Sequence, residues 1–275
     1  MKERDGSTNA QFAGSIPTLY DRHLGPVIFE PYAEDLVRRV VAPKGGRVLE
    51  VACGTGIVTR RLRERLGENA TVTATDLNVG MIECAKRKPG MPAGIEWRQA
   101  DATALPFEDG LFDAVICQFG IMFVPDKAAA MREARRVLKP GGSFVFNVWG
   151  TLAQNPFARI VHETVADFFP TDPPDFYLVP FGFNDREIIR RMLEEAGFEA
   201  IEFEDVPLEG RAASAEEFAI GLVEGNPIAI AISERGVAET AEIVEAVADA
   251  VAGELGDRPV KVRLHAIVVA AKRPK

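Results

Sequence analysis

Short apolar runs that suit buried strands alternate with helical apolar stripes through the first half of the chain, and this alternation constrains the fold most. The patterns predict strands at 47–51, 71–75, 95–99, 112–118 and 143–149, and helices at 31–40, 57–66, 79–88 and 127–138. Strands and helices that alternate at this spacing form a parallel sheet with helices on both faces. Right-handed crossovers leave few topologies for such a sheet. We therefore predict an α/β fold with a doubly wound, mostly parallel sheet.

The regular alternation stops after Gly150. Residues 151–183 contain five prolines among seven aromatic side chains, so we expect an irregular segment packed over an apolar surface. Asn184 and Glu187 have the spacing of an N-cap and its partner, which predicts a helix that ends at Gly197. Two more strands are expected at 198–206 and 260–271, with helices between them.

Composition excludes several classes of protein. The 275 residues carry a net charge of −9, which disfavours nucleic acid as the main partner. The longest purely apolar stretch, 266–271, is far shorter than the ~20 residues that span a bilayer, so no membrane span is expected. Three cysteines without a C-x-x-C pair and a polar N-terminus favour a cytoplasmic protein, and no metal site is predicted.

The strongest chemical signal is Val48-Leu-Glu-Val-Ala-Cys-Gly-Thr-Gly56, a strand that enters a Gly-x-Gly turn before a helix. Glycines there allow a ligand to approach the backbone at the N-terminus of the helix. Dinucleotide-binding turns have a third glycine where this chain has Thr59, which disfavours an NAD-dependent oxidoreductase. Asp76 and Asp101 end the next two strands at the same sheet edge, where an acid can meet ribose hydroxyls or an adenine amino group.

Together with Ala102, Phe112-Asp113 and Arg136-Val-Leu-Lys-Pro-Gly-Gly142, these motifs resemble the class I S-adenosylmethionine-dependent methyltransferases. The resemblance covers roughly residues 30–206, and the segment from Phe119 to the Lys-Pro-Gly-Gly motif is most similar to the ubiquinone/menaquinone biosynthesis methyltransferases. Ala52 stands where the family often has glycine. The resemblance implies a Rossmann-like sheet of seven strands. It also implies a single domain over 1–275, with helical cap insertions at about 1–36, 151–183 and 207–258.

The resemblance also implies roles for individual residues. The turn 52–56, with Ala52, Cys53, Gly54 and Gly56, would hold the methionine part of S-adenosylmethionine, and Glu50 would fix that turn. Asp76 would bind the ribose, Leu77 and Met81 would pack on the adenine, and Asp101 and Ala102 would bind the adenine edge. Gln118 and Phe119 would lie near the methionine amino group and the methyl. An aromatic side chain such as Phe119 or Tyr20 could stabilise the sulfonium by cation–π attraction.

Methyl transfer is an in-line displacement in which alignment comes first, and an oxygen or carbon acceptor would also need a general base. The sequence assigns no catalytic residue, and the candidates are His162, His23 and Tyr20. We expect a small, apolar or aromatic methyl acceptor, S-adenosylhomocysteine as product, and any homodimer to form through the cap insertions. The alternatives are methylation of a protein or nucleic acid, or a non-catalytic S-adenosylmethionine-binding protein.

Overall fold

The computed structural model describes residues 11–275, which form two compact units. The sheet unit consists of residues 32–149, 183–206 and 266–275. The helical unit consists of residues 11–31, 150–182 and 207–265, three stretches that overlap the predicted cap insertions. The single domain expected over residues 1–275 stays a prediction.

Seven strands form one sheet, in the order β3-β2-β1-β4-β5-β7-β6. Their bounds are β1 Arg47–Val51, β2 Thr71–Asp76, β3 Ile95–Gln99, β4 Phe112–Gln118, β5 Leu138–Trp149, β6 Glu199–Ala212 and β7 Val260–Lys272. The pairs β1–β2, β1–β4, β2–β3 and β4–β5 are parallel, and β7 runs antiparallel to β5. The predicted α/β class and mostly parallel, seven-stranded sheet are confirmed.

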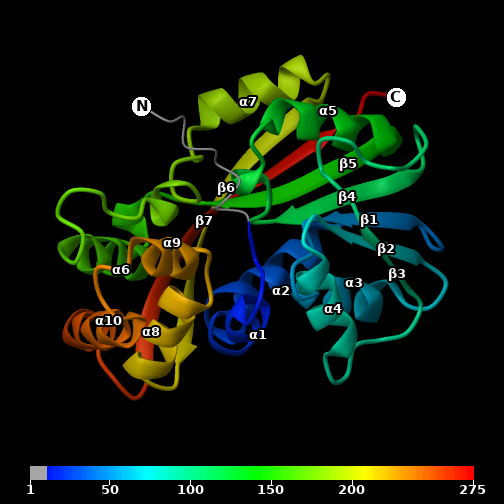
Figure 1. Ribbon diagram of the computed structural model, residues 1–275. Coiled ribbons are helices and arrows are strands. Elements are labelled where there is room, and N and C mark those ends of the chain that lie inside the picture. The colour runs from blue at the N-terminus through cyan, green and yellow to red at the C-terminus, as the bar shows by residue number, and fades with distance from the viewer. Residues whose placement is uncertain (1–10) are drawn as a thin grey trace. The chain divides into compact units, whose positions relative to one another are not determined.

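Helices cover both faces of the sheet unit. Figure 1 shows α2 (Glu30–Arg39), α3 (Ile57–Leu66) and α4 (Val79–Arg87) on one face, and α5 (Lys127–Val137) and α7 (Arg186–Glu195) on the other. This arrangement follows from right-handed crossovers in a sheet whose strand order reverses direction between β1 and β4. The reversal places the carboxyl ends of β1 and β4 side by side, which is where such sheets bind ligands.

The inner strands β1 and β4 are buried because helices cover the sheet on both sides, whereas the edge strands β3 and β6 are largely exposed. Val48 and Leu49 of β1 are fully buried, as are Val115 and Ile116 of β4. Continuous apolar runs of this kind are typical of parallel strands. The helices turn their apolar stripes inward, and Leu62 of α3 is fully buried.

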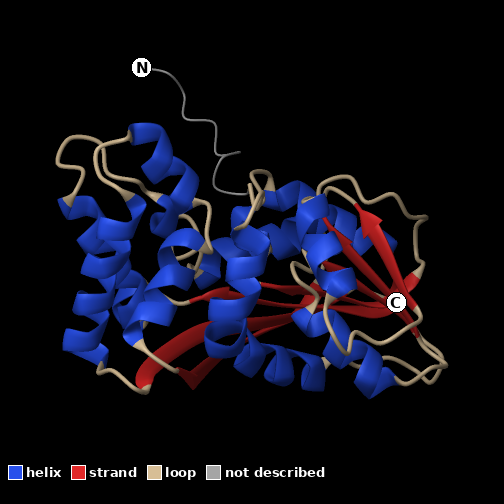
Figure 2. Cartoon of the chain, turned by 60° about the horizontal axis from the view of Figure 1, so that its bottom comes forward, coloured by secondary structure: helices blue, strands red, loops and turns tan. Residues whose placement is uncertain are grey.

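The helical unit contains α1 (Ile16–Leu19), a π-helix η2 (Tyr20–Phe29), α6 (Pro156–Asp167), α8 (Ala215–Glu224), α9 (Ile228–Arg235) and α10 (Thr240–Leu255). Figure 2 shows these helices in blue as a group, in which α10 packs against α6 and α8, and α8 packs against η2. Residues 11–275 also contain three short 3-10 turns: η3 (Ile121–Phe123) in the sheet unit, and η4 (Leu152–Gln154) and η5 (Phe176–Leu178) in the helical unit.

The prediction of an irregular segment at 151–183 is wrong in part, because helix α6 occupies residues 156–167. Pro156 is the first residue of that helix, where its fixed φ is favourable and its missing N–H costs nothing. Phe157, Ile160, Val161 and Val165 then form a buried helical stripe. One of the five prolines therefore marks a helix start, and the other four follow the helix.

Several predicted boundaries also change. The N-cap of α7 is Asp185, one residue later than expected, and its carboxylate accepts the N–H groups of Glu187 and Ile188. Strand β5 begins at Leu138 because its first residue already pairs with Phe112 across a bulge. Strand β6 extends to Ala212, into the segment expected to be a cap insertion.

None of the helices in residues 11–275 is both long and apolar enough to cross a membrane. The same residues contain no group of His, Cys, Asp and Glu side chains arranged to hold a metal ion.

Candidate active site

The turn after β1 is tied to the end of β2 by backbone and side-chain hydrogen bonds. The N–H of Cys53 donates to the carbonyl of Thr75 at 2.9 Å, and the N–H of Gly54 donates to Oδ2 of Asp76 at 2.8 Å. Ala52, Gly54 and Gly56 all have positive φ, at 55°, 54° and 75°. The chain therefore reverses sharply between β1 and α3, at the carboxyl edge of the sheet.

The two glycines of this turn serve different purposes. A Cβ on Gly56 would lie 2.9 to 3.0 Å from the side chains of Met91, Ala85 and Trp97, so this glycine lets the turn pack closely against its neighbours. A Cβ on Gly54 would meet no atom within 4 Å. Gly54 thus presents bare backbone to open space, as a turn that a ligand approaches must do.

Asp76 is buried at the end of β2, and its carboxylate is already engaged with backbone. Besides the bond from Gly54, its Oδ1 accepts the N–H of Asn78 at 2.8 Å. Burial raises the pKa of Asp76 above its ordinary value, although these hydrogen bonds oppose the rise. The next residue, Leu77, is 53% exposed, which is unusual for a leucine at the end of a central strand.

Glu50 lies in β1 beneath the turn, where it is fully buried. Thr59 Oγ1 donates to its carboxylate at 2.5 Å, and burial raises the pKa of Glu50 to about 8. Thr59, whose position argued against a dinucleotide fold, therefore serves as the partner of a buried acid. In the described part of the chain, no basic group contributes to the pKa of Glu50 or Asp76.

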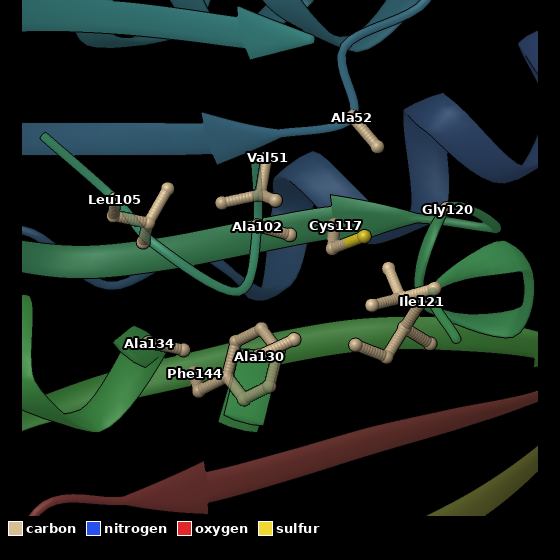
Figure 3. Close-up of a pocket in the computed structure, with 11 residues that line it drawn as sticks. Val51, Ala52, Ala102, Leu105, Cys117, Gly120, Ile121, Ala130, Ala134 and Phe144 are labelled. Atoms are coloured by element: carbon tan, nitrogen blue, oxygen red, sulfur yellow. The ribbon is translucent and has the colours of Figure 1, made fainter. Parts of the chain in front are cut away.

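The end of β3 contributes Asp101 and Ala102. Asp101 is exposed, and its Oδ1 accepts from the N–H and hydroxyl of Thr103 at 2.8 and 2.7 Å. Ala102 lines a small apolar cavity of about 10 Å³ between β1, β4, β5 and α5. Figure 3 shows Ala52, Cys117 and Ile121 at the same cavity, so it lies directly beside the turn and the end of β4.

The end of β4 is occupied by an aromatic cluster that the sequence did not predict. Phe119 stacks on Trp149 with ring centroids 3.9 Å apart and an interplanar angle of 10°. Tyr32 meets both rings edge-on, at 5.3 and 5.4 Å, and donates its hydroxyl to the carbonyl of Val206. Gln118, which precedes Phe119, is half-buried. The sequence feature that could have indicated this cluster is Trp149, which is the last residue of a predicted strand and so lies at the carboxyl edge of the sheet.

All twelve residues predicted to bind the cofactor lie in the sheet unit, at or next to the carboxyl ends of β1 to β4. Met81 is buried in the first turn of α4. The three catalytic candidates lie in the helical unit. Tyr20 and His23 are on η2, where Tyr20 stacks on Phe29 at 4.6 Å, and His162 is on α6. Burial and the charge of Arg22 lower the pKa of His23, which favours the neutral imidazole.

The turn and the strand ends described above lie at the carboxyl edge of a doubly wound sheet, where such sheets bind ligands. A family model described as a methyltransferase domain matches residues 49–146. The demethylmenaquinone methyltransferase of Staphylococcus aureus (strain JH9) is 32% identical over 201 residues, which cover 67% of this chain and 82% of the relative.

Solved structures show the same fold. Phosphoethanolamine N-methyltransferase 2 of Haemonchus contortus, in complex with S-adenosylhomocysteine, has a TM-score of 0.62 at 18% identity and covers 100% of this chain and 61% of its own. The cyclase SpnF has a TM-score of 0.60 at 21% identity, with 94% of this chain and 92% of its own covered. A cyclase among these neighbours shows that the fold alone does not determine the reaction.

The chain belongs to the class I S-adenosylmethionine-dependent methyltransferases, as the sequence motifs implied. It is an enzyme that uses S-adenosylmethionine as methyl donor. The residues present fit this cofactor. Gly54 presents bare backbone at the turn, and the positive ammonium and sulfonium groups of S-adenosylmethionine would favour ionisation of the buried Glu50 and Asp76, whose pKa values burial raises.

Proposed function

We propose that this enzyme transfers the methyl group to a small, apolar or aromatic molecule. The likeness to demethylmenaquinone methyltransferase over 201 residues carries this proposal, because that relative's name denotes a quinone acceptor. The net charge of −9 supports it too, since an acidic protein attracts RNA or DNA poorly.

The cofactor-binding residues are part of the same proposal. Gly54 and its neighbours in the turn 52–56 would hold the methionine part, and Asp76 would accept hydrogen bonds from the ribose hydroxyls. Leu77 supports a contact with the adenine, because its 53% exposure leaves a face for the ring to cover. Asp101 and Ala102 would bind the edge of the adenine, and Phe119 would lie beside the methyl.

When bound, S-adenosylmethionine supplies an electrophilic methyl on sulfur and leaves as S-adenosylhomocysteine. The chain must then align an acceptor with that methyl and exclude water. For an oxygen or carbon acceptor, His23, His162 and Tyr20 stay the candidates for the general base.

An acceptor panel tests the proposal. The enzyme is incubated with S-adenosylmethionine and either reduced demethylmenaquinone, phosphoethanolamine, a lysine-rich peptide or transfer RNA, and S-adenosylhomocysteine is measured. We expect turnover with the quinol alone. Turnover with the peptide or RNA but not with either small molecule would overturn the proposal.

A homodimer through the helical unit also stays a prediction, and sedimentation equilibrium of the full chain tests it.

A further inference from the structure

Two strained backbone corners meet at the carboxyl edge of the sheet unit. Ala52, after β1, and Phe119, after β4, are non-glycine residues with φ of 55°. This left-handed conformation is unfavourable for a residue that has a side chain, so the surrounding structure must impose it. The corners touch, because a Cβ on Gly120 would lie only 2.3 Å from the Cβ of Ala52. The corner at Phe119 and Gly120 therefore packs directly against the turn after β1.

Asn147 in β5 fixes the second corner. It pairs in register with Gln118, and the N–H of Phe119 donates both to its side-chain Oδ1 at 3.0 Å and to its backbone carbonyl at 3.3 Å. The side chain of Asn147 is fully buried. Its Oδ1 therefore holds the amide of the strained residue from inside the sheet.

The side-chain nitrogen of Asn147 argues against a role in packing alone. Asn147 Nδ2 is buried and has no hydrogen-bond partner among residues 11–275. A buried donor without a partner destabilises a fold, and an apolar residue of similar size would avoid that cost. A residue that is unfavourable for stability and strains its neighbour is typical of a functional site.

We propose that Asn147 is a positioning residue for methyl transfer. By accepting the N–H of Phe119 it holds that residue in its left-handed conformation, with the ring stacked on Trp149. Through Gly120 it also keeps the corner at Ala52, and with it the turn 52–56, in place. The inference rests on the proposed role of Phe119 and this turn in binding S-adenosylmethionine.

Two substitutions of similar size separate this role from packing. Asn147→Leu removes the side-chain acceptor, whereas Asn147→Asp keeps an acceptor oxygen in either protonation state. We expect Asn147→Leu to weaken S-adenosylmethionine binding by about three- to tenfold in calorimetry, the range for one hydrogen bond, without lowering the Tm. Asn147→Asp should retain affinity within about twofold. Equal weakening by both substitutions would overturn the proposal.

A spectroscopic signal reports the same corner without any ligand. In a Trp97→Phe background, Trp149 is the remaining tryptophan, and its near-ultraviolet circular dichroism reports the stack with Phe119. The signal should fall in Asn147→Leu and persist in Asn147→Asp. An unchanged signal in Asn147→Leu would contradict the proposal even if the enzyme bound no cofactor. Failure of the cofactor-site assignment would instead appear as unchanged affinity in Asp76→Ala.

A double-mutant cycle covers the case in which Asn147→Asp does not fold. Phe119→Gly removes the Cβ that makes positive φ costly, so the corner should no longer need Asn147. Asn147→Leu should then change affinity by less than about twofold in the Phe119→Gly background. The same loss in both backgrounds would show that Asn147 does not act through Phe119.

Discussion

The carboxylate of Asp76 already serves the fold, and its proposed contact with the ribose would use the same group. It accepts N–H groups from Gly54 and Asn78, so it shapes the turn before any ribose binds. We predict that Asp76→Ala weakens S-adenosylmethionine binding by ~1.5–3 kcal/mol, the value for a hydrogen bond to a charged group. Calorimetry measures this loss, and the Tm separates it from a general loss of structure. Unchanged affinity would remove Asp76 from the ribose role.

Glu50 makes stability depend on pH in the direction opposite to an ordinary ion-paired acid. Its pKa rises from 4.5 to about 8 on folding because burial disfavours the charged form. Between these values the folded state binds more protons than the unfolded state, so the free energy of unfolding falls as pH rises.

The corresponding prediction compares the wild type with Glu50→Gln. Denaturant unfolding of the wild type should lose at least ~1 kcal/mol between pH 5.5 and 8, since one pKa unit corresponds to ~1.4 kcal/mol. Glu50→Gln should lose clearly less, because its amide does not titrate. The same slope in both proteins would show that Glu50 does not ionise in this range.

At the scale of elements, the turn between β1 and α3 offers a matched pair of glycines. Gly54 and Gly56 both have positive φ, so Gly→Ala costs each about 1–2 kcal/mol of backbone strain. Only Gly56 adds a steric clash, with Ala85 and Trp97 at 3.0 Å. We predict that Gly56→Ala lowers the Tm more than Gly54→Ala does. Relative to its loss of Tm, Gly54→Ala should lower the cofactor affinity more than Gly56→Ala does. Thermal unfolding and calorimetry check the pair, and the reverse order would contradict it.

The elements of the sheet unit were the most predictable part of the chain. The strands at 95–99 and 112–118 and the helix at 57–66 occur where the patterns placed them. The apolar pattern is strong at 112–118 and 57–66 because both elements are largely buried, whereas 95–99 is an edge strand that is only partly buried. Helix α6 was missed because seven aromatics and five prolines over 151–183 masked a buried stripe of normal helical spacing.

At the scale of the whole molecule, the sequence leads us to expect that residues 1–30, 151–183 and 207–258 cover the acceptor. Limited proteolysis of the full chain, with and without S-adenosylmethionine, tests this. We predict slower cleavage in these segments with cofactor present. Cleavage that is unchanged in all three would contradict the expectation, while a rise in Tm would still show that cofactor binds.

The sequence by itself determined the sheet, the glycine turn after its first strand and the family, because these depend on local periodicity and on motifs a few residues long. Only the tertiary structure brought Asn147 and Trp149 from β5, and Tyr32 from α2, to Phe119 at the end of β4. Those contacts join residues 28 to 117 positions apart, and strand pairing together with the packing of α2 on the sheet creates them. The contact between the two corners at Ala52 and Phe119 also could not be predicted from the sequence, because neither alanine nor phenylalanine indicates a positive φ.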